Sequence, residues 1–324
     1  MSWFLKPTGR RVMKAVAFSG MASGFLMYYL PNSYFTEQYE LATQLHKDGI
    51  PVRLPKNILP LVEAALNDID ISKAKQSLIF PYIGYGFDIF HAGSTLLSRK
   101  CVLGLPISFK YSNFEDFDVT GIVVNNEPVP WSSPEGKSLQ QSLILSDDAK
   151  KFAIARELVH IDSSEPILKG VFTSSVMCMC YIFASTVNKR LNFYARPRNL
   201  RLCFYTLVSC FGYAFWALGN DLTCVSNEAS ADETVANISE TYARGGLEFY
   251  EKILQRNIAL RSLIKDRGEA LYTAFGNDRV LLRTRHMAFS ERRDYMKTRL
   301  QNYGKCEEVP KISEAVQVPS RGTV

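Results

Sequence analysis

The first 36 residues of this 324-residue chain contain no aspartate or glutamate. Residues 188 to 201 lack acidic side chains as well, although they carry five basic ones. Basic residues that flank apolar segments do not form the single patch expected of a nucleic-acid-binding surface, despite the net charge of +6. They follow the pattern of a membrane protein, in which basic loops stay on one side of the bilayer. We therefore expect a lipid bilayer and no nucleic acid as a partner.

Closely spaced cysteine pairs are also missing. The seven cysteines contain no CxxC pair, which excludes a zinc finger, and their odd number in apolar surroundings does not fit a disulfide framework. Four of them lie inside apolar runs, namely Cys178, Cys180, Cys203 and Cys210. The remaining three are candidate exposed thiols: Cys101, Cys224 and Cys306.

Three apolar runs have lengths close to that of a membrane span. The first, Ala15 to Leu30, follows a basic N-terminus and resembles a mitochondrial import signal merged with an uncleaved anchor. A secretory signal peptide is the alternative, but no small-residue cleavage site follows the run. The others extend from about 170 to 187 and from about 202 to 219. Gly20 and Gly24 form a GxxxG pattern that is typical of close helix packing.

The second predicted span contains the sulfur-rich run Met177-Cys178-Met179-Cys180, which would suit Cu(I). On a helix only Met177 and Cys180 share a face. Membrane packing is therefore favoured over a copper site, and we expect no cofactor.

Three spans place residues 32–166 and the chain after 220 on one side of the membrane. The basic N-terminus and loop 188–201 lie on the other side, which is the matrix if the membrane is the mitochondrial inner one, and the soluble part then faces the intermembrane space. A buried helical hairpin in a soluble protein is the alternative, but it leaves the basic loop unexplained.

The predicted fold class is an α+β membrane protein that is mostly helical. Helices are expected over 36–47 and 60–69, a small β region over 78–144, and a break at Gly245-Gly246 in the last helical part. The expected segments are 1–31 (anchor), 32–166 and 220–306 (two parts of one soluble domain), 167–219 (paired spans) and 307–324 (a disordered tail).

A helix over residues 145–160, LSDDAKKFAIARELVH, carries an incomplete metal-binding motif. Ser146 is a good N-cap residue. Zinc peptidases use HExxH, in which two histidines bind the ion and the glutamate acts as general base. Here the glutamate is Glu157 and the second histidine is His160, but Arg156 replaces the first histidine. An arginine stays charged and has no lone pair for a metal.

Residues 228–232 spell EASAD, an ExxAD pattern. In zinc peptidases of the gluzincin type such a glutamate is the third ligand, and the aspartate orients a ligand histidine. The order of the incomplete motif, two spans, ExxAD and an HxxxxxR element (His286 to Arg292) resembles the membrane-bound Oma-type and HtpX-type peptidases. The resemblance implies a gluzincin-like soluble domain with five vestigial metal-site positions: Arg156, Glu157, His160, Glu228 and Asp232.

Loss of the first ligand argues against catalysis, because a catalytic zinc ion needs three protein ligands and an open position. We expect the guanidinium of Arg156 to pair with Glu228, Glu157 or both in place of an ion. In the alternative, Arg156 points to solvent. His91, a lone histidine among aromatic residues, is given no role.

The chain also resembles the transmembrane protein 177 family of the mitochondrial inner membrane, over nearly its whole length. The closest blocks are KFAIAREL (151–158), ARGGLEFYEKILQRNIALRSL (243–263), GEALYT (268–273) with the following Gly276-Asn277, and Arg292-Arg293-Asp294. The resemblance implies a non-enzymatic role in biogenesis of cytochrome c oxidase subunit II, together with the membrane chaperone of that subunit and copper-delivery factors. The family brings no catalytic residues to this chain.

Three functions are therefore considered. The first is a non-catalytic assembly factor whose peptidase-like cleft holds a partner segment. The second is an active membrane zinc metallopeptidase in protein quality control, and the third is a structural scaffold that recognises partners through its spans.

Overall fold

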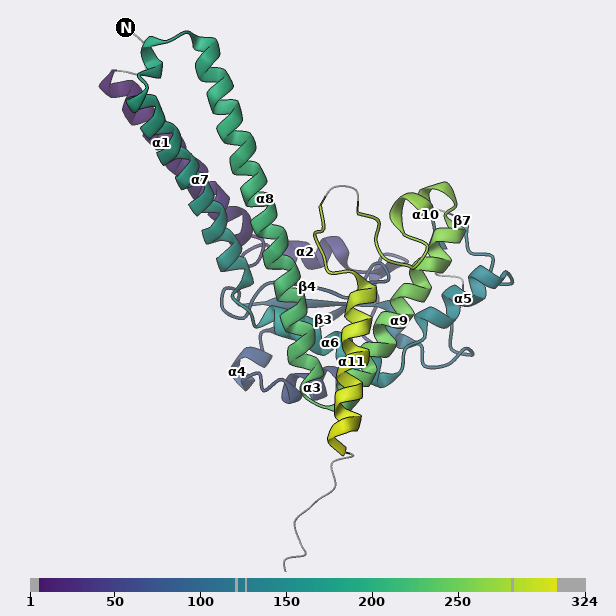
Figure 1. Cartoon of the computed structure of the whole chain (residues 1–324). Helices are drawn as coiled ribbons and strands as arrows, with labels where there is room; N and C mark the ends of the chain where they lie inside the picture. Colours follow the sequence, from purple (N-terminus) through teal and green to yellow (C-terminus); the bar gives the residue numbers. More distant parts are fainter. Residues whose placement is uncertain (1–5, 120–121, 126, 281–282, 308–324) are drawn as a thin grey trace, which may run out of the picture.

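A computed structural model describes residues 6–119, 122–125, 127–280 and 283–307. Three long helices form an arm that projects from a mostly helical globular part, which corresponds to the predicted soluble domain (Figure 1). The tail predicted to be disordered lies outside the described residues from 308 onward.

The arm consists of α1 (Pro7–Tyr29), α7 (Glu165–Arg190) and α8 (Arg198–Ala236). By length and composition, α7 and α8 are long and apolar enough to cross a membrane, and they contain the second and third of the three predicted spans. Large apolar side chains remain exposed along them, including Phe183, Phe211 and Phe215. The connection between α7 and α8, with the short helix η4 (Phe193–Ala195), lies at the far end of the arm beside the described N-terminal end of α1 (Figure 1). Both basic segments of the predicted topology are therefore at the same end.

Helix α1 packs along α7. Gly24 lies against Thr173 and Met177 of α7, whereas a side chain at Gly20 would meet open space. Cys180 instead lies against Gly212 of α8. Met177 and Cys180 therefore contact different helices, which favours packing over a shared copper ion.

The predicted β region contains a three-stranded sheet. Strands β3 (Ile79–Gly84) and β5 (Cys101–Pro106) are parallel, with Ile79 opposite Cys101, and β4 (Phe90–Ala92) pairs antiparallel with β5. The strand order β3-β5-β4 leaves β4 at an edge. Every residue of β5 is buried, so the prediction of an exposed thiol at Cys101 is wrong.

Two short hairpins complete the strands, β1 (His46–Lys47) with β2 (Ile50–Pro51) and β6 (Val123–Val124) with β7 (Glu127–Pro128). The helix predicted over 36–47 is shorter in the structure. It ends at Thr43 as α2 (Thr36–Thr43), and the first hairpin begins at His46. Asp48 and Gly49 both have positive φ, and they turn the chain back into β2.

The other helices surround the sheet and pack on one another. Helix α6 (Asp147–Ile161) contacts α3 (Leu59–Asp68), α8, α9 (Glu240–Leu263) and β4. Helix α9 also contacts α5 (Pro134–Leu143), α10 (Asp266–Leu271) and α11 (Phe289–Glu307). Two further helices of four residues each are α4 (Lys73–Gln76) and η2 (Ile107–Lys110). The helices predicted over 60–69 and 145–160 are confirmed as α3 and α6, whereas α5, capped by Ser133, was not predicted.

Gly245 and Gly246 do not break the helix as predicted. Helix α9 continues through both, and its start is set by Ser239, whose side chain caps the amide of Tyr242. A Cβ atom at Gly245 would lie 2.3 Å from the carbonyl oxygen of Asp148. The pair of glycines therefore allows α9 to approach the backbone at the start of α6.

We expect Gly245→Ala to lower the free energy of unfolding of the soluble domain by about 1–3 kcal/mol, because the backbone of α6 cannot move aside as a flexible side chain would. Gly20→Ala, at a helical glycine with nothing within 4 Å of the added atom, is the matched control and should leave it unchanged. Guanidinium denaturation of the full-length protein in detergent, followed by tryptophan fluorescence, measures both. Equal midpoints for the two variants would contradict the close packing of α9 on α6.

Candidate functional site

Helix α6 holds the incomplete motif at the centre of the soluble domain. The Ser146 side chain accepts a hydrogen bond from the amide of Ala149 at 3.2 Å, and Glu248 of α9 binds both the amide and the hydroxyl of Ser146. This double anchoring fixes where α6 begins. Three turns later, Arg156 and Glu157 lie between the sheet and α9.

Arg156 makes a buried ion pair with the glutamate that would be the general base. Its Nε atom donates to Glu157 Oε1 at 3.0 Å, and its Nη1 atom donates to the Tyr250 hydroxyl of α9 at 3.3 Å. Its side chain is only 14% exposed, so the alternative in which Arg156 points to solvent is wrong. Of the two partners expected for Arg156, the structure shows the pair with Glu157.

A histidine from the sheet completes the surroundings of Glu157. His91 Nδ1 of β4 lies 2.6 Å from Glu157 Oε2, and its ring stacks on His160 at a centroid distance of 5.6 Å. His160 Nδ1 lies 3.4 Å from Glu165 at the start of α7. The prediction that His91 has no role at the site missed this contact, because nothing in its spacing along the chain points to α6.

These contacts favour the charged forms of both Arg156 and Glu157. Burial alone would raise the pKa of Glu157, but the Arg156 guanidinium and the hydrogen bond with His91 hold it well below its usual range. Burial lowers the pKa of Arg156, and the charge of Glu157 more than offsets this effect. Glu157 is therefore a carboxylate with both oxygen atoms engaged.

The ExxAD and HxxxxxR elements meet on the other side of Tyr250. Asp232 of α8 accepts bonds from Arg292 Nε at 2.6 Å and Nη2 at 2.9 Å, and from the Tyr250 hydroxyl at 2.6 Å. The predicted partner of Asp232 was a ligand histidine, whereas the structure gives it Arg292 and Tyr250. A continuous polar chain thus runs from Glu157 through Arg156 and Tyr250 to Asp232 and Arg292.

Glu228 faces the segment that precedes α11. Its Oε1 atom lies 2.6 Å from His286 Nδ1, while its Oε2 atom accepts from the amide of Met287 at 2.9 Å and lies 3.7 Å from Arg292 Nη1. Contacts with Cys224 and Glu228 raise the pKa of His286 to about 10. Sequence reasoning brought His286 and Arg292 to this site, but it did not foresee the contact with Cys224.

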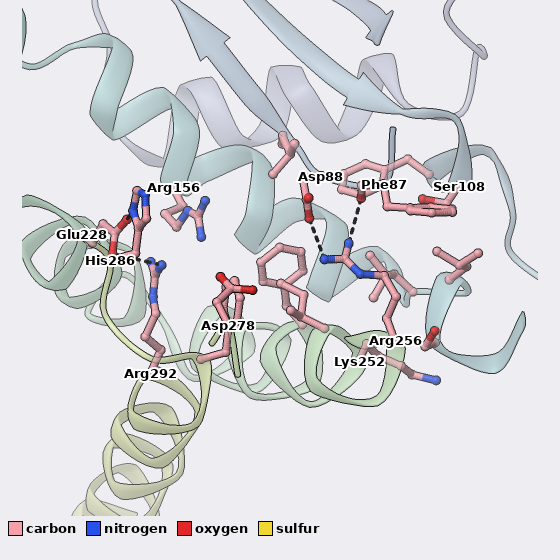
Figure 2. Close-up of a pocket in the computed structure, with 18 of the residues that line it drawn as sticks. Phe87, Asp88, Ser108, Arg156, Glu228, Lys252, Arg256, Asp278, His286 and Arg292 are labelled. Atoms are coloured by element: carbon pink, nitrogen blue, oxygen red, sulfur yellow. Dashed lines mark hydrogen bonds and ion pairs between the residues drawn. The ribbon is translucent and has the colours of Figure 1, made fainter. Parts of the chain in front are cut away.

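Two cavities meet at these side chains. One, of about 320 Å³, is lined by His91, Glu157, His160, Glu165, Cys224 and Glu228 among others. The other, of about 240 Å³, extends along α9 (Figure 2). Figure 2 shows Arg156, Glu228, His286 and Arg292 at one end of this second cavity, and Arg256 bound to Asp88 and to the carbonyl of Phe87 at the other. Arg156 and Glu228 line both cavities.

The residues at the vestigial metal position do not fit a catalytic zinc ion. Arg156 places a fixed cation beside Glu157, and the carboxylate of Glu157 is shared between Arg156 and His91. A general base must reach a metal-bound water, and both oxygen atoms of Glu157 are taken. The zinc-peptidase mechanism, in which this glutamate activates a metal-bound water, therefore does not fit the contacts of Glu157.

Comparisons with known proteins agree with one another. A family profile described as transmembrane protein 177 matches residues 100–305. The chain is 34% identical to transmembrane protein 177 of Rattus norvegicus over 255 residues, which covers 78% of this chain and 80% of the relative. Its identity to the Xenopus laevis protein of the same name is 32% over 301 residues, covering 90% and 94%.

The Homo sapiens relative, also called transmembrane protein 177, is 33% identical over 78% of this chain and 80% of its own length. No solved structure matches the chain. The matched region includes α6, the paired long helices and all the vestigial positions. The chain therefore belongs to the transmembrane protein 177 family.

Proposed function

We propose that this protein is a non-catalytic assembly factor of the mitochondrial inner membrane. In this proposal, the cleft of a gluzincin-like pseudo-peptidase holds a segment of newly made cytochrome c oxidase subunit II. The observation that carries the proposal is that Arg156 and His91 bind the two carboxylate oxygen atoms of Glu157, where a peptidase would have a free general base beside a metal ion. Two cavities nevertheless adjoin these side chains.

The edge strand β4 supports binding of an extended segment. It pairs with β5 on one side, and no other strand in the described part of the chain pairs with its outer edge. His91 of β4 lines one cavity, and Phe87 to Ile89, just before β4, line the other. Main-chain pairing at such an edge gives affinity without any catalytic group.

The pseudo-peptidase part of the proposal rests on how the motifs meet. Helix α6 contacts α8, which carries EASAD. Glu228 and Asp232 of EASAD lie within the same polar cluster as Arg156. His286 and Arg292 bind these two carboxylates from the far end of the chain. Three motifs that are distant in sequence thus lie together, and this proximity supports the pseudo-peptidase proposal.

We further propose three membrane spans, with α1 as the third beside α7 and α8. The basic N-terminus and the basic loop 188–201 lie at the same end of the arm, which supports placing both in the matrix. The soluble domain then faces the intermembrane space. The proposed partners are subunit II, its membrane chaperone and copper-delivery factors, as the family resemblance implies.

Site-specific photo-crosslinking in mitochondria tests the cleft. A photoreactive amino acid at Asp88 or Asp278, both exposed at the cavity along α9, is expected to crosslink to subunit II during its synthesis. The matched control is Glu135 on α5, which is also exposed but lines neither cavity. Crosslinks to subunit II from Glu135 and from neither cleft position would overturn the proposal.

The two other functions predict different results in the same preparation. A scaffold acting through its spans would give crosslinks from Phe211, which is exposed on α8, and none from Asp88 or Asp278. An active metallopeptidase would give chelator-sensitive cleavage of a bound substrate. We expect no such cleavage, because both oxygen atoms of Glu157 are engaged.

A further inference from the structure

One cluster of metal-binding side chains shares Glu228 with the predicted metal-site positions and extends one helical turn away from them along α8. Cys224 and Glu228 are four residues apart on α8 and therefore share a face, and His286 reaches them from the segment before α11. The ligand atoms of these three residues all lie within 4.8 Å of one another. We call this cluster the Cys224–Glu228–His286 trio.

The distances within the trio suit a tetrahedral ion. His286 Nδ1 lies 3.8 Å from Cys224 Sγ and 2.6 Å from Glu228 Oε1. Zinc–ligand bonds of about 2.0–2.3 Å place tetrahedral ligand atoms about 3.3–3.6 Å apart. The remaining pair, Cys224 and Glu228, has its ligand atoms within 4.8 Å. Binding of an ion therefore requires the His286–Glu228 contact to open, with loss of the proton between them, and side-chain adjustment to bring Cys224 Sγ and the carboxylate to the same ion.

The second oxygen of Glu228 is already oriented. Its Oε2 atom accepts from the amide of Met287 and faces Arg292, which leaves Oε1 directed at His286. Such partners hold a ligand carboxylate in one orientation and strengthen metal binding. The amide comes from the residue after His286, so one short segment supplies both a ligand and its support.

Charge and access are also compatible with a divalent cation. Arg156, Lys169 and Arg292 repel a cation, but a thiolate and a carboxylate in direct contact supply two negative charges to the ion. Cys224 lines the cavity of about 320 Å³, and the His286 side chain is 64% exposed. An ion can therefore enter, and water can take the fourth position.

We infer that Cys224, Glu228 and His286 bind one Zn²⁺ ion with a water molecule as the fourth ligand. One sulfur, one nitrogen and one oxygen donor form a set that zinc accepts in proteins. The ion would fasten the segment around His286 to α8 beside the cleft. It would not supply hydrolysis, because Glu157 remains bound to Arg156 and His91.

The test is the zinc content of the full-length protein in detergent, measured by elemental mass spectrometry. The protein is stripped with chelator, exposed to zinc and desalted. We expect about one zinc per chain in the unmodified protein, and near zero in Cys224→Ala and His286→Ala. Cys203→Ala, at an exposed cysteine of the same helix, and His46→Ala are matched controls that should keep the ion.

His160→Ala distinguishes this trio from the vestigial peptidase position. Retention of zinc in that variant is expected, whereas loss of zinc there with retention in Cys224→Ala would overturn the inference. Less than stoichiometric zinc in the unmodified protein would overturn it too. The chelator removes the ion from every variant before zinc is added. Denaturation of these zinc-free proteins therefore shows separately whether a substitution has damaged the fold.

Cobalt(II) gives a second measurement. Binding at the trio should produce a thiolate-to-cobalt charge-transfer absorption that Cys224→Ala removes and Cys203→Ala retains. Crosslinking from Asp88 and Asp278 does not require the ion, so failure of the zinc experiment leaves the proposed function standing. Likewise, failure of the crosslinking experiment leaves the zinc site standing.

Discussion

Replacement of Asp232 by alanine is expected to lower the free energy of unfolding of the soluble domain by about 3–5 kcal/mol, because it leaves the buried guanidinium of Arg292 without the carboxylate that accepts two of its hydrogen bonds. Arg292 is 3% exposed and donates two hydrogen bonds to Asp232, which is itself 1% exposed. The Tyr250 hydroxyl also loses its acceptor.

The position of Asp232 explains why a single side chain has so large an effect. It belongs to α8, Arg292 to α11 and Tyr250 to α9, so the cluster joins three helices at one point. The guanidinium of Arg292 also lies over the Tyr250 ring, 4.8 Å from its centroid. Loss of the carboxylate therefore weakens the contacts among all three helices at once.

Denaturation of the full-length protein in detergent measures the effect of Asp232→Ala. Glu233→Ala, at the exposed neighbouring carboxylate on the same helix, is the matched control and should change stability by no more than about 0.5 kcal/mol. The double variant Asp232→Leu, Arg292→Met removes both charges and should lose less than Asp232→Ala alone. A loss in Asp232→Ala no larger than that in Glu233→Ala would show that the pair does not hold the helices together.

The features of this site that lie within one helix could be predicted from the sequence, whereas the contacts between distant segments could not. The N-cap at Ser146 and the position of Arg156, Glu157 and His160 on one helix are properties of neighbouring residues, and the structure shows both as expected. Two of the three predicted spans likewise lie in helices that are long and apolar enough to cross a membrane. His91 joins the site only because β4 pairs with β5 and lies beside α6. That pairing depends on contacts between distant segments, which periodicity does not report.

Two further residues illustrate the same limit. The Tyr250 hydroxyl connects Arg156 to Asp232, a contact that the position of Tyr250 along α9 does not reveal. The Gly245-Gly246 pair predicted a break from its low helix propensity, but close packing on α6 overrides that propensity. In both cases the deciding contact comes from another helix.

Arg156→Ala is expected to destabilise the soluble domain by a similar amount, about 3–5 kcal/mol, because it leaves Glu157 buried without its guanidinium partner. Glu157 is 3% exposed, and after the change His91 is its remaining polar contact among those described. Arg244→Ala is the matched control, since Arg244 is exposed on α9 and makes a surface pair with Glu240. The same denaturation measurement compares the two.

A double variant separates the cost of a broken pair from the value of the pair itself. Arg156→Met with Glu157→Gln removes both charges while keeping much of the volume, so it should lose less stability than Arg156→Ala. Arg156→Lys should fall between Arg156→Ala and the unmodified protein, because lysine keeps the charge but not the planar fork that reaches both Glu157 and Tyr250. Equal stability of Arg156→Ala and Arg244→Ala would mean that Glu157 does not need a fixed cation, and the idea that Arg156 stands in for a metal ion would then fail.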